Sequence, residues 1–196
     1  MKTTITIKTS TIKASVHCAP DTRDTRYYLN GVLMKARCDK LSVVSTTGQL
    51  LSAFSDDIDP VEEPFEIIVP IEAVKLALKS KARILQLVEL DNGRWSLGDC
   101  IFTPIFGRFP DYARVIPTVG KSGDEQHLGI QPKYLTAAIK ALNDYYDDAN
   151  AQMAHSQDNI DGLAVFHRGD SRAVVVVSPW GHTKENPKKH YVGFRG

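Results

Sequence analysis

The stretch GRFPDYARVIP, from Gly107 to Pro117, is the most informative part of this sequence. A second informative stretch, RYYLNGVLM (Arg26–Met34), lies about 80 residues upstream. Neither stretch carries a catalytic motif, so both indicate a binding function rather than catalysis. Within the first stretch, Arg108 and Asp111 are spaced so that an ion pair between them would fix the segment locally.

Length and composition set broad limits. The 196 residues suit one large domain or two small ones. A chain of this length can bury a hydrophobic core that needs no disulfides or metal sites for stability. Their 42% hydrophobic and 24% charged content is typical of soluble globular proteins, and no apolar run approaches the ~20 residues of a membrane span. Cys18, Cys38 and Cys100 show no metal-ligand or disulfide spacing, which favours the reducing cytoplasm. A net charge of +1 gives no global attraction to nucleic acid.

The first of three similar units covers residues 1–55. It begins with alternating Ile5 and Ile7, which predicts a strand rather than a signal peptide. A weak helix and three further strands should follow, at residues 10–18, 26–35, 40–46 and 50–54. An acidic linker with two prolines then covers residues 56–64. Its carboxylates indicate a solvated loop rather than a metal site.

The second unit covers residues 65–117 and repeats the pattern. A strand at 65–69 precedes Pro70, which suits the first position of a helix. Apolar residues at helical spacing follow from Ile71 to Leu85. Asn92-Gly93 predicts a hairpin. The remaining strands are expected at residues 85–90, 94–97 and 100–103.

The third unit covers residues 127–196 and follows a polar boundary at 118–126 that contains two glycines. A short strand near 128–130, a helix after Pro132 and paired strands at 162–166 and 172–178 are expected, before a polar, basic tail. Repetition of one strand–helix–strand pattern is typical of a duplicated module. Unrelated strand pairs that end in glycine turns are the alternative.

The two quoted stretches resemble bacterial sliding clamps, the β subunit of the replicative DNA polymerase. Gly107–Pro117 resembles the segment that closes the middle domain of the family, and Arg26–Met34 resembles another part of that domain. The resemblance implies an α+β DNA-clamp (processivity) fold of duplicated strand–helix–strand units with antiparallel sheets. Residues 1–117 would form one complete clamp-like domain, residues 118–126 a linker, and residues 127–196 a shortened half-domain. The family's first domain has no counterpart.

Sliding clamps bind short linear peptides of polymerase, clamp loader and repair proteins between their middle and last domains. In this sequence Gln49 and Leu50 stand where the family has a histidine and an arginine at the pocket rim, and Tyr191, Val192 and Phe194 would represent the closing strand. An ordinary core role is the alternative for the apolar positions. The resemblance implies a pocket formed by Leu29, Thr46, Gly48, Leu51, Pro110, Arg114 and Val115.

The family lines its DNA hole with helices. Lys75, Lys79 and Arg83 are spaced four residues apart and would form one basic stripe on the second helix. With Lys133 and Lys140 of the third unit, they would face DNA phosphates in a non-specific, salt-sensitive way. A solvated helix face is the alternative reading.

The resemblance therefore implies a cytoplasmic DNA replication accessory protein, a processivity factor that needs no cofactor. Its partners would be clamp-binding peptides of polymerase or related factors, DNA, and further copies of itself. A non-ring adaptor or decoy that competes with a clamp is a second hypothesis, and a clamp-fold DNA-binding regulator is a third. No phosphate loop, nucleophile elbow or metal-type histidine pair supports an enzyme.

Overall fold

The computed structural model describes residues 3–20, 24–116, 130–147, 152–155, 164–167 and 172–178. In chain order its elements, with η for a 3₁₀ helix, are β1 (Thr4–Lys8), α1 (Thr9–Val16), η1 (Tyr27–Leu29), β2 (Gly31–Arg37), β3 (Lys40–Thr46), β4 (Leu50–Asp57), β5 (Phe65–Pro70), α2 (Ile71–Ala77), η2 (Leu78–Ser80), β6 (Ile84–Glu89), η3 (Asp91–Gly93), β7 (Trp95–Leu97), β8 (Cys100–Phe102), η4 (Tyr112–Arg114), α3 (Pro132–Tyr146), β9 (Gln152–His155), β10 (Ala164–His167) and β11 (Ala173–Val177).

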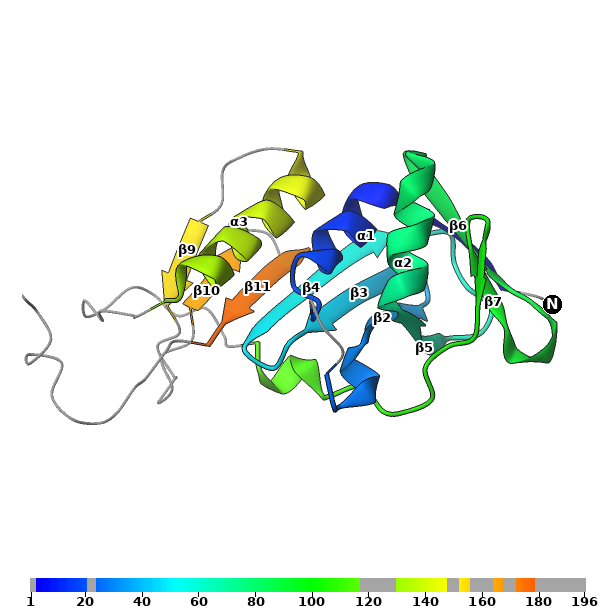
Figure 1. Cartoon of the computed structure of the whole chain (residues 1–196). Helices are drawn as coiled ribbons and strands as arrows, with labels where there is room; N and C mark the ends of the chain where they lie inside the picture. Colours follow the sequence, from blue (N-terminus) through cyan, green and yellow to red (C-terminus); the bar gives the residue numbers. More distant parts are fainter. Residues whose placement is uncertain are drawn as a thin grey trace, which may run out of the picture.

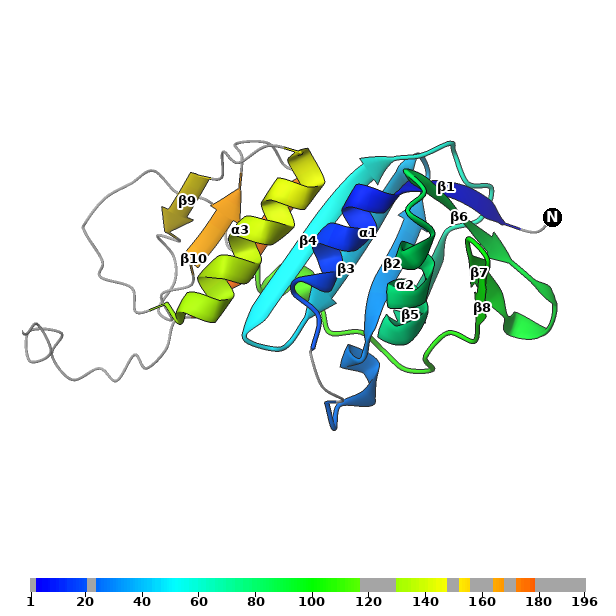
Figure 2. The same cartoon turned by 45° about the horizontal axis from the view of Figure 1, so that its top comes forward.

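The strands form two antiparallel sheets. One has the order β1-β6-β7-β8, and the other has the order β5-β2-β3-β4-β11-β10-β9. Helices α3, α1 and α2 lie in a row over one face of the larger sheet, as both ribbon views show (Figures 1 and 2). None of the helices in the described ranges is long and apolar enough to cross a membrane.

The first two units exchange their first strands. β1 pairs with β6 of the second unit, and β5 pairs with β2 of the first. The exchange joins the two units into one body, because their shared core contains Ile7 of β1, Val32 of β2 and Leu87 of β6. The sequence pattern did not reveal this exchange, because alternation predicts a strand but not its partner.

Alternating side chains give the large sheet two apolar faces. In β2, Val32 and Met34 pack in the core beneath α1 and α2, whereas Leu33 lies in a separate cluster on the opposite face. Val44 of β3 and Ile68 of β5 join Leu33 there. This second cluster contains no residue of α1, α2 or α3, so the sheet separates a side covered by the α-helices from a side covered by η1 and other segments.

The third unit extends the large sheet through β11, which pairs with β4 from Phe54↔Ala173 to Leu50↔Val177. On the helix side, α3 packs beside α1 and its Ala138, Ala141 and Leu142 are buried. Tyr145 of α3 stacks on Phe54 with 4.9 Å between the ring centroids. The junction is therefore a continuous sheet below and a helix pair above.

The prediction that a solvated linker begins at residue 56 is wrong. β4 continues to Asp57, and the Asp56 side chain is buried against α1 and α3. Thr11 donates a hydrogen bond to Asp56, Lys8 Nζ lies 3.3 Å from its Oδ1, and Tyr145 OH lies 3.3 Å from the same oxygen. Because each of these groups comes from another element, the carboxylate ties the first unit to the third.

The strand predicted at residues 26–35 starts later than expected. Asn30 accepts a hydrogen bond from the Asp24 backbone N–H at 2.7 Å and donates one to the Asp24 carbonyl at 2.9 Å. These bonds curl the chain into η1, and β2 begins only at Gly31. The hairpin at Asn92-Gly93 is confirmed, since β6 and β7 pair across it. The expected strand near 128–130 and tail at 180–196 lie largely outside the described residues.

Asp144 of α3 links two groups of the first unit. It accepts hydrogen bonds from Lys13 Nζ at 2.8 Å and from His17 Nε2 at 2.6 Å. Burial acts to raise the pKa of Asp144, but the two hydrogen bonds outweigh burial and leave the pKa below its usual value of 3.8.

Asp144→Asn should therefore change how stability depends on pH. A pKa lowered by folding stabilises the protein above the unfolded value of 3.8, and this contribution disappears as the pH falls through the lower folded value. The wild type should exceed the variant in free energy of unfolding at pH 6, and the difference should shrink below pH 3.8. Urea denaturation followed by circular dichroism measures both. A difference that grows towards low pH would contradict the assignment.

Candidate functional site

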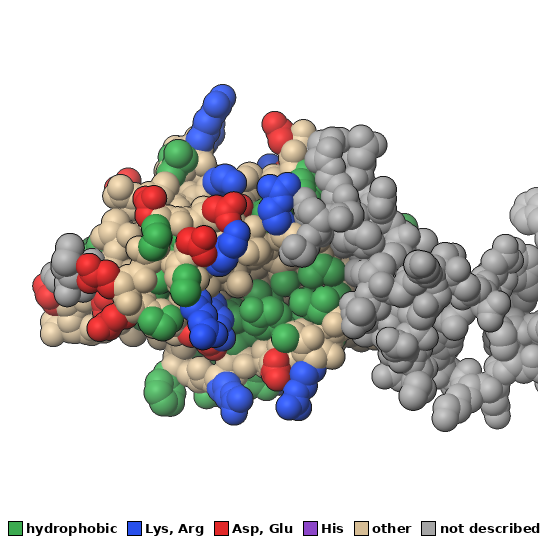
Figure 3. Space-filling model, turned by 180° about the vertical axis from the view of Figure 1, so that it is seen from behind, with side chains coloured by type: hydrophobic (Ala, Val, Ile, Leu, Met, Phe, Trp, Pro, Cys, Tyr) green, Lys and Arg blue, Asp and Glu red, His purple; other side chains and the backbone are tan. Residues whose placement is uncertain are grey.

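A hollow of about 550 Å³ opens on the side of the large sheet that the helices do not cover. Figure 3 shows hydrophobic side chains gathered in it, with Lys and Arg side chains nearby on the same face. The hollow, called the sheet pocket below, is lined by Arg26, Tyr28, Leu29, Thr46, Gly48, Gln49, Leu50, Leu51, Pro110, Tyr112, Val115, Val176 and Ser178.

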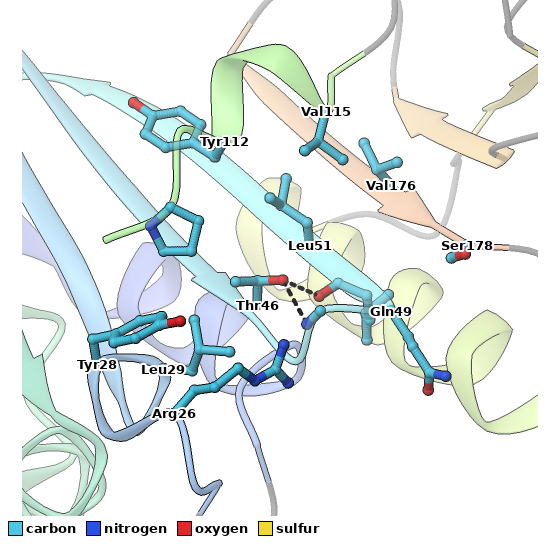
Figure 4. Close-up of a pocket in the computed structure, with 13 residues that line it drawn as sticks. Arg26, Tyr28, Leu29, Thr46, Gln49, Leu51, Tyr112, Val115, Val176 and Ser178 are labelled. Atoms are coloured by element: carbon cyan, nitrogen blue, oxygen red, sulfur yellow. Dashed lines mark hydrogen bonds between the residues drawn. The ribbon is translucent and has the colours of Figure 1, made fainter. Parts of the chain in front are cut away.

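The β3–β4 turn shapes one end of the sheet pocket. Thr46 Oγ1 donates to the Leu50 carbonyl at 2.8 Å and accepts from the Gly48 N–H at 3.0 Å (Figure 4). Gly48 has φ +89, a left-handed conformation that side chains disfavour. The hydrogen bonds of Thr46 thus stabilise the turn, and Gly48 allows its left-handed backbone conformation.

Arg26 fixes the same turn from the η1 side. Its Nη2 donates to the Thr47 carbonyl at 3.0 Å and to Asp24 Oδ2 at 2.7 Å. Hydrogen bonds from Arg26 hold the pKa of Asp24 at about 2, so the carboxylate stays charged at neutral pH. The guanidinium is therefore oriented at the rim before any ligand arrives.

The floor comes from the junction between the first and third units. Leu51 of β4 lies directly opposite Val176 of β11 in the ladder, and both are buried. Val115 is 43% exposed and sits above them in the close-up, while Leu29, Tyr28 and Arg26 stand on the other side (Figure 4). An apolar floor with a few fixed polar groups at its edge suits an apolar ligand that needs a defined orientation.

All but one of the seven residues expected in the pocket line it. The exception is Arg114, whose side chain is 86% exposed and pairs with Asp111 at 3.0 Å. The sequence spacing suggested that Asp111 pairs with Arg108. In the structure Asp111 pairs with Arg114 instead. Tyr191, Val192 and Phe194, expected to close the pocket, lie outside the described residues.

Some lining residues were not among the predicted set. Arg26 and Tyr28 belong to the stretch RYYLNGVLM, so their proximity to Leu29 was a usable signal. Val176 and Ser178 come from the third unit, and only the pairing of β11 with β4 brings them to the pocket. Gln49 and Leu50, which stand where the family has a histidine and an arginine, also line the pocket. Leu50 is largely buried, and Gln49 accepts a hydrogen bond from Tyr134.

The predicted basic stripe is not a helical stripe. Lys75 lies on α2 and Lys79 on η2, but Lys81 adopts φ +57 and ends the helix, so Arg83 lies off it, just before β6. All three are exposed, as are Lys133 and Lys140 on α3. This helix face also exposes apolar Leu76, and on α1 Lys13 is paired with Asp144. Lys75, Lys79 and Arg83 therefore do not form one stripe along a single helix.

No protein-family model matches the chain. The β sliding clamp of Proteus mirabilis is 40% identical over 102 residues, which is 48% of this chain and 28% of that protein. The β sliding clamp of Pseudomonas putida is 32% identical over 146 residues, which is 69% of this chain and 39% of that protein. The chain thus matches well under half the length of these relatives.

The solved structures agree with this relationship at the level of fold. The Helicobacter pylori β clamp, crystallised with a DNA ligase peptide, aligns with a TM-score of 0.69 over 90% of this chain and 66% of that one, at 16% identity. The expected α+β clamp fold is therefore confirmed.

Gly48→Ala should destabilise the protein in two ways. The left-handed φ costs about 1–3 kcal/mol for a residue with a side chain, and the added Cβ would lie 2.8 Å from Arg26 Nη1. Gly93→Ala is the matched control, since Gly93 has φ +68 and no atom within 4 Å of an added Cβ. Urea unfolding should show a larger loss for Gly48→Ala. Equal losses would mean that Arg26 does not hold the turn.

Proposed function

We propose that this chain, which has the sliding-clamp fold and resembles part of the bacterial β clamp in sequence, binds short linear peptides of DNA polymerase or related replication factors. The observation that carries the proposal is the sheet pocket, an apolar hollow lined by residues of all three units. In this role the chain is a cytoplasmic replication accessory protein rather than an enzyme.

The chemistry of the lining supports an extended peptide with apolar side chains. Leu29, Leu51 and Val176 offer buried apolar surface, and each apolar side chain placed there would gain about 25 cal/mol per Å² removed from water. Arg26 and Ser178 stand at the edge and can bond peptide carbonyls or a carboxylate. The Helicobacter pylori β clamp, which shares this fold, binds a DNA ligase peptide, and this supports the proposal.

The side chains on the helix face favour one form of this function, an adaptor or decoy that binds peptides without encircling DNA. Arg83 lies off the helix, Lys13 is paired with Asp144, and Leu76 of α2 is 53% exposed. A surface that follows phosphates needs unpaired cations along its length. The chain would then compete with a clamp for its peptide partners.

Val115→Asp and Leu51→Asp should both weaken peptide binding. A carboxylate placed in the apolar floor or mouth loses hydration without gaining a partner, which costs roughly several kcal/mol when it is buried. Fluorescence anisotropy with a labelled clamp-binding peptide should show a loss of more than about tenfold in affinity, equivalent to about 1.4 kcal/mol.

Ile84→Asp is the control, since Ile84 is exposed and apolar but lies on the small sheet away from the pocket. It should leave peptide affinity unchanged. Melting curves must show that Val115→Asp remains folded, which its partial exposure permits. Unchanged affinity in a folded Val115→Asp variant would remove the pocket from the proposal.

Replacing Lys75, Lys79 and Arg83 together with alanine separates the adaptor from a DNA-bound clamp. For an adaptor, wild type and triple variant should bind peptide equally and show equally weak affinity for duplex DNA at 150 mM salt, about physiological ionic strength. Electrophoretic mobility shifts at several salt concentrations measure the DNA affinity. Tight, salt-sensitive binding that the triple variant loses would favour the DNA-bound forms instead.

A further inference from the structure

The β3–β4 turn, residues 47–49, stands between two hollows. Gly48 and Gln49 are exposed and line the sheet pocket on one side. Thr47 lines a second hollow of about 470 Å³ on the side of the helices, together with His17 at the end of α1 and Ala137 of α3. Because the turn has open space on both sides, hydrogen bonds rather than close packing must hold it in place.

Hydrogen bonds within the turn fix its shape. Thr47 Oγ1 accepts from the Gln49 N–H at 3.3 Å and from the Leu50 N–H at 3.1 Å. Thr46 Oγ1 bonds Gly48 and Leu50 in the same way. All of these partners lie within residues 46–50, so the bonds close the loop on itself and leave its position to contacts from other elements.

Hydrogen bonds from three other segments reach the turn and set its position. Arg26 Nη2 donates to the Thr47 carbonyl at 3.0 Å. From the third unit, the Ser178 N–H donates to the Gln49 carbonyl at 2.8 Å, and the Tyr134 hydroxyl donates to Gln49 Oε1. Gln49 is therefore the residue by which the third unit holds the turn, through its backbone and its side chain.

Tyr134 is the rigid member of its pair with Gln49. It lies in the first turn of α3, its ring packs against the buried cluster that contains Leu50, and Lys133 Nζ lies 4.6 Å from the ring centroid. Gln49 is exposed and has a long side chain with several rotatable bonds. Its amide points away from Leu51 in the close-up (Figure 4). The tyrosine thus determines where the glutamine side chain lies.

We propose that Tyr134 is a positioning residue for the sheet pocket. Its hydrogen bond to Gln49 holds the β3–β4 turn in place and keeps the Gln49 amide out of the pocket mouth. Without this bond, the turn must be ordered again when a ligand binds, which costs conformational entropy. A released amide would also lose hydration over the apolar floor. The inference rests on the proposed peptide binding, but the position of the turn is a property of the free chain.

Tyr134→Phe removes the hydroxyl and keeps the ring. Peptide affinity, measured by fluorescence anisotropy with the labelled clamp-binding peptide, should fall about two- to tenfold, the range that one neutral hydrogen bond can supply. In a Gln49→Ala background the same change should have no further effect, because the acceptor is already missing. Losses that simply add in this double-mutant cycle would contradict an action through Gln49.

Tyr145→Phe is the matched control. The Tyr145 hydroxyl also joins α3 to the first unit, because it donates to the Ser55 carbonyl at 2.7 Å, but Tyr145 does not line the sheet pocket. This variant should leave peptide affinity unchanged. An equal loss in Tyr134→Phe and Tyr145→Phe would mean that any loosening of α3 weakens binding, and would overturn the specific role of Tyr134.

Amide exchange with solvent, measured by NMR on the free chain, tests the same bond without peptide. The N–H groups of Gln49 and Leu50 should exchange faster in Tyr134→Phe than in the wild type, while those of the β2–β3 ladder stay unchanged. Equal exchange at Gln49 and Leu50 in both proteins would overturn the positioning role. Faster exchange in the variant, with a wild type that binds no peptide, would support the hold on the turn and remove only the proposed function.

Discussion

The pairing of β4 with β11 is the interaction on which the rest of the structure depends. It joins the third unit to the first by five residue pairs from Leu50↔Val177 to Phe54↔Ala173. On one side of the sheet it brings α3 beside α1 and buries Phe54 against Tyr145. On the other side it sets Val176 against Leu51 and so creates the floor of the sheet pocket. Without this pairing the chain would have half a pocket and an open sheet edge.

Polar groups make the junction specific where apolar packing alone would allow sliding. Asp56 is buried among groups of α1, β1 and α3, and Thr11, Lys8 and Tyr145 all contact its carboxylate. Asp144 repeats the arrangement from α3 with Lys13 and His17. Because a register shift of one residue would separate these partners, they hold the third unit in the position that completes the pocket.

Much of the fold could be predicted from sequence, because alternation, helical spacing and Asn92-Gly93 identify most elements. What escaped prediction depends on contacts distant in sequence. The sequence predicts a solvated Asp56, but α1 and α3 bury it in the folded chain. Arg83 fits a helical spacing, but Lys81 ends the helix before it. Only part of the pocket lining could be predicted, for the same reason. Leu29, Thr46 and Leu51 come from recognisable segments, whereas Val176 reaches the pocket only because β11 pairs with β4.

We propose that peptides bind in the sheet pocket, where the first and third units meet. The most direct measurement is a titration of unlabelled clamp-binding peptide into the ¹⁵N-labelled chain, followed by two-dimensional NMR. Amide shifts should change together in three separate segments: at Thr46–Leu51, at Val115, and at Val176 and Ser178. Changes confined to the helices, or to one segment alone, would contradict it.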